Sequence, residues 1–172
     1  RAILGQFDGE RITMKELHRF ENNYIEMNGV FYWDTPYLYN QLKQGLLAFR
    51  QGGYGELDAF GIDTWGVDFA LLDSDGVRVG EIVSYRDSRT EGMDQELEQV
   101  LAFRDHYSEC GIAKQPFNTV YQMMAVIREH PEYAEQVDDF LMMPEYLSYI
   151  LTGKKAHEWT NCTTGALCNA DS

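Results

Sequence analysis

The sequence predicts an α/β domain, and two observations support that prediction. Short runs of β-branched and aromatic residues flank Asp-Gly and Asn-Gly pairs, a pattern typical of strands joined by hairpin turns. Further along the chain, apolar residues recur every three or four positions, which is the spacing of amphipathic helices. With 172 residues and 44% hydrophobic content, the chain is long enough to bury one core. No linker-like tract interrupts it, so we expect a single domain.

The amino-terminal region is expected to form a meander of three strands. Residues 1–7 and 12–20 read as strands on either side of the pair Asp8-Gly9. The run VFYWD follows a second hairpin signal, Asn28-Gly29, and its β-branched and aromatic residues favour a third strand.

From Thr35 the spacing of apolar residues changes to that of a helix. Thr35 is a candidate cap and Pro36 suits the first helical position. One apolar face is predicted, formed by Leu38, Leu42, Leu46 and Phe49. The helix should end at Gly52-Gly53, and residues 57–63, LDAFGID, should then form a strand parallel to its neighbour, because a crossover helix separates the two.

Helices are expected to dominate the second half of the chain. The hairpin LLDSDGVRV comes first, and three helical faces follow it. These faces consist of Met93, Leu97, Val100 and Leu101; of Val120, Met123, Met124 and Ile127; and of Tyr146, Leu147, Ile150 and Leu151.

Composition limits the classes of partner. The chain carries 28 Asp and Glu against 14 Lys and Arg, a net charge of −14, and such a surface repels phosphate backbones and anionic lipids. We therefore expect neither nucleic acid nor a membrane as a partner. No apolar run reaches the roughly 20 residues that span a bilayer, and the first residues lack the pattern of a secretion signal, so a cytoplasmic protein is expected.

The common motifs of phosphate, dinucleotide, zinc and serine-hydrolase chemistry are missing from the sequence. Cys110, Cys162 and Cys168 lack CxxC spacing, so we expect free thiols rather than disulfides or a zinc site. The four histidines also stand apart from other metal-binding side chains. No metal ligand is therefore predicted.

The segment GIDTWGVDF supplies the main candidate site. If the expected parallel strand ends here, its carboxyl end faces a cleft, where open α/β sheets bind ligands. Gly66 would let a ligand approach the backbone, Asp63 and Asp68 could accept hydrogen bonds from hydroxyl groups, and Trp65 offers an apolar face to a sugar. The alternative is a strained turn with capping aspartates.

Three further polar clusters have both structural and functional interpretations. Arg86, Asp87 and Arg89 could bind an anion, although a network among themselves is favoured by the acidic composition. Asn118, at the start of a predicted helix, could cap that helix or bind a ligand. The run EWTNCTT, residues 158–164, is expected to be a hydrogen-bonded turn that returns into a strand.

Several segments together resemble the amino-terminal domain of the FGGY carbohydrate kinases. They are GIDTWGVDFALLDSDG, YRDSRT, PFNTVYQ and LMMPEYLSYILTGKKAHEWTNCTT, with LHRFENN in the first meander. GIDTWGVDF, YRDSRT and MPxYxSYxLTG occur in the family's order at similar intervals, and the resemblance runs from end to end of the chain. Within the family it points to the kinases of L-rhamnulose.

This resemblance implies a fold and a reaction. The fold is an actin-like, ribonuclease-H-like α/β domain with a mixed sheet and flanking helices, paired with a second such domain across an ATP site. The reaction transfers the γ-phosphoryl group of ATP, with Mg²⁺, to the primary hydroxyl of L-rhamnulose. Phosphoryl transfer depends on positioning and charge neutralisation more than on covalent catalysis.

The resemblance also implies site residues. Gly66 matches the family glycine whose backbone contacts the sugar, and Asn118 lies in a segment that supplies a sugar contact in related kinases. Three residues share the loop of Gly66 and are inferred to line the same cleft: Thr64, Trp65 and Asp68. Arg1 matches the last residue of the family's DxGxxSxR phosphate loop and is assigned to ATP binding.

By the same resemblance, residues 1–172 are a partial sugar-binding domain. The first strand, most of the phosphate loop, the catalytic aspartate and the second domain would lie outside it, so no catalytic residue is assigned here. A sheet without its first strand exposes an edge, so homo-association is expected. Two alternatives stay open: a kinase of another ketose such as L-fuculose, and a non-catalytic sugar-binding or assembly domain on the same scaffold.

Overall fold

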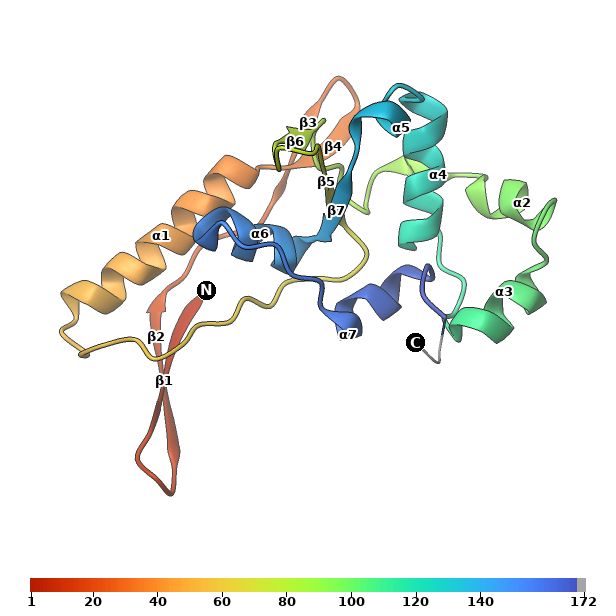
Figure 1. The fold of residues 1–172 in the computed structure, drawn as a ribbon. Helices are drawn as coiled ribbons and strands as arrows, with labels where there is room; N and C mark the ends of the chain where they lie inside the picture. The colour runs from red at the N-terminus through yellow and green to blue at the C-terminus, as the bar shows by residue number, and fades with distance from the viewer. Residues whose placement is uncertain (170–172) are drawn as a thin grey trace. The chain divides into compact units, whose positions relative to one another are not determined.

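The computed structural model describes residues 1–169, and the chain divides into two compact units. The first unit contains Arg1–Tyr24 and Asp34–Gly61, and the second contains Ile25–Trp33 and the chain from Ile62 onward. Figure 1 traces the chain through its helices and strands.

The first unit begins with the predicted hairpin. β1 (Ala2–Phe7) pairs antiparallel with β2 (Ile12–His18). Asp8 starts the turn, and its Oδ1 accepts hydrogen bonds from the N–H groups of Glu10 and Arg11, both at 2.9 Å. Gly9 follows with φ of 103°, a conformation that glycine adopts without steric cost. The Asp8-Gly9 prediction is confirmed.

The predicted helix is α1 (Thr35–Gln51), and Gly52 is its carboxyl-terminal cap as expected. Asp34, not Thr35, is the amino-terminal cap, because its carboxylate accepts the N–H of Tyr37 at 2.9 Å while Thr35 is already helical. α1 packs closely on β1: a Cβ added at Gly45 would lie 2.6 Å from the Cβ of Ala2.

The strand expected at residues 57–63 is wrong, because this segment is irregular and pairs with no strand. Leu57 and Phe60 are exposed rather than packed into a sheet. An apolar run becomes a strand only where it can pair with a neighbouring strand and bury one face. The prediction of a strand after the crossover helix assumed that both were available.

The expected three-stranded meander is also wrong. β3 (Tyr24–Met27), which the sequence analysis did not identify, pairs with β4 (Val30–Trp33), and the β1–β2 pair forms a separate sheet. Asn28 and Gly29 join β3 to β4 with φ of 53° and 80°. Two positive φ values at the centre of a two-residue loop are the signature of a type I′ hairpin, so this turn is confirmed.

A three-stranded sheet forms the centre of the second unit, in the order β6-β5-β7. β5 (Phe69–Leu72) pairs antiparallel with β6 (Arg78–Val79), as the LLDSDGVRV hairpin predicted. On its other side β5 pairs with β7 (Asp139–Met142), also antiparallel. The parallel strand was expected at residues 57–63, whereas the strand that follows this segment, β5, is antiparallel to both of its neighbours.

The helices expected around residues 120–127 and 146–151 are confirmed, although Ile127 of the first predicted face is exposed. The face expected from Met93 to Leu101 is only partly correct, because the helix ends at Glu98 and Val100 and Leu101 are exposed. Further short helices accompany these elements. The elements are η1 (Ser88–Thr90), α2 (Met93–Glu98), α3 (Phe103–Cys110), α4 (Thr119–Glu129), α5 (Tyr133–Gln136), α6 (Met143–Thr152), α7 (Trp159–Cys162) and η2 (Thr163–Gly165). Residues 158–164 thus form helical turns, and the strand expected after them is not present among the described residues.

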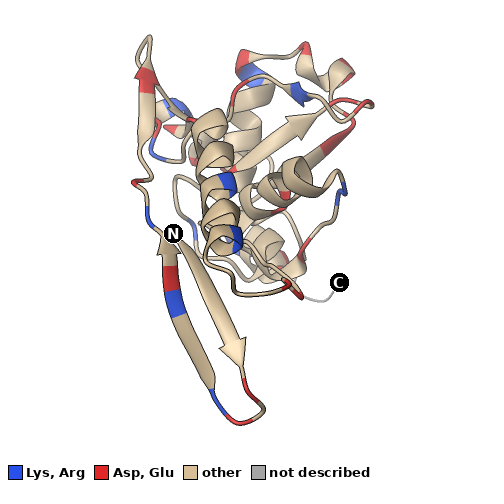
Figure 2. Cartoon of the chain, turned by 90° about the vertical axis from the view of Figure 1, so that its left-hand side faces the viewer, with Lys and Arg blue, Asp and Glu red and all other residues tan. Residues whose placement is uncertain are grey.

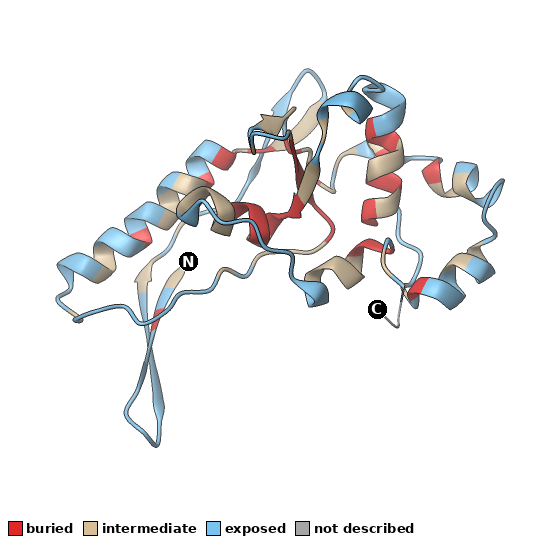
Figure 3. Cartoon of the chain, viewed as in Figure 1, coloured by how far each residue is buried: buried red, intermediate tan, exposed pale blue. Residues whose placement is uncertain are grey.

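α4 contributes to two buried clusters of the second unit. Val126 packs with Phe69, Leu71 and Met142 of the sheet. Tyr121 and Ala125 pack with Met93 of α2. Buried residues gather in β5, along α4 and at the junction of β7 with α6 (Figure 3). This packing fixes the elements around the candidate site.

Candidate functional site

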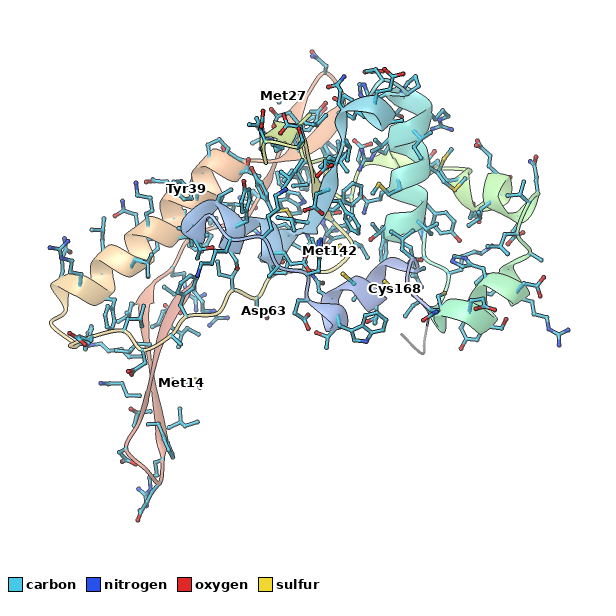
Figure 4. The ribbon with its side chains drawn as sticks, viewed as in Figure 1. Met14, Met27, Tyr39, Asp63, Met142 and Cys168 are labelled. Carbon is cyan, nitrogen blue, oxygen red and sulfur yellow. The ribbon has the colours of Figure 1, made fainter. Side chains whose placement is uncertain are left out.

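A pocket of about 360 Å³ lies in the second unit. Its walls come from residues 62–66 before β5, from the first turns of α6, and from residues 154–164. It brings together Thr64, Trp65 and Gly66, as predicted, whereas Asp68 and Asn118 are not among the lining residues. In Figure 4, Asp63 lies on the irregular segment that leads into β5. The site therefore precedes an antiparallel strand, and its predicted place at the end of a parallel strand is wrong.

The chain makes a tight reversal where the pocket wall meets β5. The N–H of Asp68 donates to the carbonyl of Gly66 at 2.9 Å, and Val67 between them has φ of 69°. A hydrogen bond across one residue of positive φ defines a classic γ-turn, which is rare and strained. A β-branched residue at positive φ adds to the strain. Val67, not Gly66, carries the strained backbone of this segment.

Gly66 is required by a neighbour in η2. A Cβ added at Gly66 would lie 2.8 Å from Oγ1 and 3.2 Å from Cβ of Thr164. Thr164 Oγ1 accepts the N–H of Val67 at 3.3 Å and donates to the carbonyl of Asn161 at 2.7 Å. The missing side chain at position 66 thus lets two walls of the pocket touch, so the glycine has a packing role besides any role toward a ligand.

Asp68 lies beneath the pocket wall and is completely buried. Its Oδ2 accepts hydrogen bonds from Trp33 Nε1 at 2.6 Å, Trp65 Nε1 at 2.9 Å and the N–H of Tyr85 at 3.2 Å. Its Oδ1 accepts from Gln122 Nε2 at 2.9 Å. Burial raises the pKa of Asp68, and the four hydrogen bonds oppose that shift. These donors occupy the carboxylate that the sequence analysis assigned to a sugar hydroxyl.

Trp65 gives the pocket an apolar wall. Its indole packs against that of Trp33 in a tilted arrangement, with ring centroids 4.1 Å apart and an angle of 37° between the planes. Because its only donor, Nε1, is bound to Asp68, Trp65 offers carbon surface to the pocket. Such a surface suits the C–H face of a sugar or a methyl group.

α4 supports this wall from behind. Asn118 occupies the cap position of α4, but its side chain makes no capping bond. Instead its Oδ1 accepts the N–H of Gln115 at 2.7 Å and its Nδ2 donates to the carbonyl of Thr164 at 3.3 Å. Thr119 Oγ1 donates to the carbonyl of Val67 at 2.7 Å. Asn118 is buried, and its visible contacts are structural.

Glu145 anchors the opposite wall, and the sequence analysis missed it. This buried carboxylate at the start of α6 accepts the N–H of Met142 at 2.8 Å and the N–H of Glu158. Glu158 in turn caps α7 by accepting the N–H groups of Thr160 and Asn161. Glu145 is the third residue of α6 and accepts the N–H of the cap residue, as in one half of a capping box. Because the cap residue is Met142 rather than Ser or Thr, the sequence carries no capping-box signal.

The rest of the lining offers both hydrogen-bond donors and acceptors. Asp63 and Lys154 are exposed charged residues of the lining, and Thr160 supplies a hydroxyl. Among residues 1–169, Asn161 Nδ2 is buried and has no hydrogen-bond partner. Convergent polar groups beside an aromatic wall are the chemistry that a small polyhydroxylated ligand requires.

The YRDSRT cluster is structural, as the sequence analysis favoured, but its bonds differ from those expected. Asp87 accepts backbone N–H groups, from Phe31 at 2.9 Å and from Arg89 at 2.8 Å, rather than a guanidinium. Arg86 lies over the ring of Tyr85, 4.9 Å from its centroid. Arg89 Nη2 donates to Gln122 Oε1 at 3.0 Å.

The remaining ionisable residues complete the description of the site. All three cysteines are free thiols. The pKa of Cys162 is raised to about 11, chiefly because the thiol is partly buried. Within the described part of the chain, no cluster of three His, Cys, Asp or Glu side chains could hold a metal ion. Lys and Arg are spread along the chain among more numerous Asp and Glu (Figure 2). No helix of residues 1–169 has the length and apolarity needed to cross a membrane.

Comparison with known proteins decides the family. The model of the amino-terminal domain of the FGGY family of carbohydrate kinases matches residues 1–172. This chain belongs to the FGGY family of carbohydrate kinases. Two curated FGGY relatives, both named rhamnulokinase, are 42% identical over 170 residues in Oceanobacillus iheyensis and 46% identical over 171 residues in Halalkalibacterium halodurans. Each alignment covers 99% of this chain and 36% of the relative, so the chain spans about a third of their length.

Solved FGGY structures confirm the fold class. A ligand-bound xylulose kinase from Lactobacillus acidophilus has a TM-score of 0.78 at 16% identity, over 94% of this chain and 32% of that one. Glycerol kinase from Plasmodium falciparum, solved with ADP, has a TM-score of 0.71 at 16% identity, over 95% and 34% of the respective chains. The α/β, actin-like fold that the resemblance implied is thus shared with these kinases.

Proposed function

We propose that this chain is the sugar-binding part of an ATP-dependent kinase that phosphorylates the primary hydroxyl of L-rhamnulose. The products would be L-rhamnulose 1-phosphate and ADP. One observation carries the proposal: the pocket joins Thr64, Trp65 and Gly66 of the family motif to polar side chains of α6, α7 and η2. The two rhamnulokinases of similar sequence support the choice of sugar.

In this proposal the chain binds and orients the sugar. The indole of Trp65 packs against its apolar face, Gly66 lets a hydroxyl approach the backbone, and Thr64 and Asn161 offer hydrogen bonds. Fixing a substrate in this way removes entropy from the barrier before the chemical step. Asp68 and Asn118 act from behind the wall, because their own contacts already occupy them.

ATP and Mg²⁺ both belong to the proposed reaction, but this chain offers a candidate residue only for ATP. We assign Arg1 to the nucleotide by its family position; its guanidinium lies 3.7 Å from Glu16 and is about half exposed, so it is free to reorient. The described residues offer no cluster that fits a metal ion. We therefore assign no Mg²⁺ ligand and no chemical step to residues of this chain.

The partners and setting follow from the proposed reaction. They are the sugar, ATP and the second domain of the kinase. A cytoplasmic location fits an enzyme that consumes ATP and forms a charged sugar phosphate. Neither nucleic acid nor a membrane is expected to bind, given the net charge of −14.

The test is an assay on the protein expressed from its complete reading frame. ADP release should depend on L-rhamnulose, and ³¹P NMR should place the phosphate on the primary carbon. The 172-residue chain alone should be inactive. Equal or faster turnover of L-fuculose would favour the other ketose kinase, and sugar binding without ADP release would indicate a non-catalytic domain.

A further inference from the structure

Gln122 connects a buried carboxylate to a partly buried guanidinium behind the pocket wall. Its side chain is 1% exposed. On one side its Nε2 donates to Asp68 Oδ1 at 2.9 Å, and on the other its Oε1 accepts from Arg89 Nη2 at 3.0 Å. The result is a continuous hydrogen-bonded chain from a partly buried guanidinium through a buried amide to a buried carboxylate.

The two charges fix which way the amide faces. A carboxylate only accepts and a guanidinium only donates, so the reversed amide would place like groups together at both ends. In the observed orientation, Nε2 also lies 3.2 Å from the carbonyl of Val67 and 3.0 Å from that of Phe117. One oriented amide thus contacts both the strained turn and the acid beneath Trp65.

From Asp68 the chain reaches the pocket. The Oδ2 that faces away from Gln122 holds the indole N–H groups of Trp33 and Trp65. Arg89 donates to Gln122 but does not line the pocket, and neither does Gln122. Their influence on a ligand must therefore pass through Trp65 and the turn at Val67.

We propose that Gln122 is a positioning residue, and that the hydrogen-bonded series Arg89–Gln122–Asp68 fixes Trp65 and the Gly66–Asp68 turn in the wall of the sugar pocket. This rests on the proposed function, since the sugar is what the wall would orient. A substitution that breaks the hydrogen bonds of this series would let the indole of Trp65 rotate and let the strained turn at Val67 relax. The pocket then binds the sugar in several poses rather than one.

A reciprocal exchange of the two polar residues tests this series. Gln122→Glu alone brings two carboxylates together across 2.9 Å, a contact in which both cannot stay ionised. Asp68→Asn alone keeps the acceptor for both indoles but turns an amide donor toward the donor of Gln122. In the double variant the two side chains exchange roles toward each other: position 68 donates, and position 122 accepts from position 68 and from Arg89. The bonds from position 122 to the carbonyls of Val67 and Phe117 are lost in this variant, so recovery is expected to be incomplete. The net charge of the series is then unchanged.

Kinetics of the complete protein give the expected result. We expect KM for L-rhamnulose to rise roughly 100-fold in Gln122→Glu and roughly 10-fold in Asp68→Asn, consistent with losing one or two charge-assisted hydrogen bonds. KM for ATP should stay constant. The double variant should recover at least tenfold relative to Gln122→Glu. Asp105→Asn and Gln136→Glu, at exposed positions, are the matched controls and should behave like the wild type.

Near-ultraviolet circular dichroism supplies a second reading that does not depend on turnover. The packed, carboxylate-bound indoles of Trp33 and Trp65 should give a signal that weakens in both single variants and returns in the double variant. Folding of the double variant where Gln122→Glu alone fails to fold would also support the proposal. A double variant that fails to fold, or whose KM increase is the product of the two single increases, would overturn it. Wild-type protein without ketose-dependent ADP release would instead refute the proposed function, while the dichroism still tests the series.

Discussion

The β1–β2 hairpin and the β5–β7 pair are both antiparallel, yet they differ in what surrounds them. Phe7, Ile12 and Met14 of the hairpin are 69%, 71% and 76% exposed, whereas Leu72 and Leu141 in the other pair are fully buried. The register places Phe7 opposite Ile12 and Gly5 opposite Met14, so the exposed side chains share one face. Met14 on the hairpin is labelled in Figure 4.

The difference shows that pairing and burial have separate causes. The hairpin is specified locally, by the bonds of Asp8 within its turn. β5 reads FALL without polar alternation, which is typical of a strand buried on both faces, and its partner β7 comes from far along the chain. A local signal thus creates a strand pair, but only distant segments bury it.

The largest expected effect comes from removing a side chain in each region. Leu141→Ala should lower the free energy of unfolding by about 2–5 kcal/mol, because it leaves a cavity in a packed core. Met14→Ala should change it by no more than about 0.5 kcal/mol, as at other exposed sites. Urea denaturation of the 172-residue chain measures both.

The same measurement tests the expected homo-association. If Met14→Ala costs much more than predicted, and the cost grows with protein concentration, the hairpin face is buried between copies of the chain. Equal costs for Leu141→Ala and Met14→Ala at every concentration would contradict the contrast between the two regions.

A smaller effect is expected at the contact of Gly66 with Thr164. Gly66→Ala introduces a Cβ 2.8 Å from Thr164 Oγ1, and overpacking of this kind costs about 1–3 kcal/mol. Adding Thr164→Ala removes the crowding hydroxyl and methyl groups and should restore most of that stability. If the sugar also approaches Gly66, its affinity should remain low in the double variant.

Paired measurements separate these two roles of Gly66. Thermal melts report packing, and calorimetric titrations with L-rhamnulose and with a nucleotide report the two affinities in the complete protein. Sugar affinity that recovers together with stability would leave Gly66 with only a packing role. Thr164→Ala alone is the control.

The parts of the fold that sequence predicts are those with local causes. The turns at Asp8-Gly9 and Asn28-Gly29 follow from residue conformation, and α1 follows from the spacing of its leucines and ends at Gly52. The strand prediction for residues 57–63 failed, because a strand needs a partner strand and the local sequence does not reveal one. The antiparallel partner of β5 was missed for the same reason.

The candidate site shows the same limit. Thr64, Trp65 and Gly66 stood out through their motif, and the structure places them in one pocket. Thr164 was predicted to lie in a hydrogen-bonded turn, but its contact with the motif across 97 residues of sequence was not foreseen. Gln122, which meets the motif across 54 residues, was missed. A signal existed for Gln122: it is a polar residue within the apolar run of α4 and is buried there.

The acid-base behaviour of the two regions should differ in sign. Burial raises the pKa of Asp68 above 3.8, whereas the N–H groups of Arg11 and then Glu10 lower the pKa of Asp8 below 3.8. The stability that Asp68 contributes is therefore present below pH 3.8 and is lost as pH rises through its folded pKa. The contribution of Asp8 is present above pH 3.8 and is lost as pH falls through its folded pKa.

Urea denaturation between pH 3 and pH 7 tests these signs with Asp68→Asn and Asp8→Asn. The stability difference between wild type and Asp68→Asn should shrink as pH rises, and the difference between wild type and Asp8→Asn should grow. Two differences that change in the same direction would contradict the assignment of desolvation to Asp68 and of turn hydrogen bonds to Asp8.

The smallest effect on stability is expected at Arg1, beside the hairpin. Its guanidinium lies 3.7 Å from Glu16 with both side chains substantially exposed, and ion pairs of this kind contribute little to folding. Arg1→Ala should therefore leave the urea midpoint unchanged. In the complete protein the same change should raise KM for ATP several-fold while KM for L-rhamnulose stays constant, because we assign Arg1 to the nucleotide. Glu16→Gln, which breaks the same ion pair but leaves the guanidinium in place, is the matched control and should preserve KM for ATP. An unchanged KM for ATP in Arg1→Ala would remove Arg1 from the nucleotide site and leave it as a surface residue of the first unit.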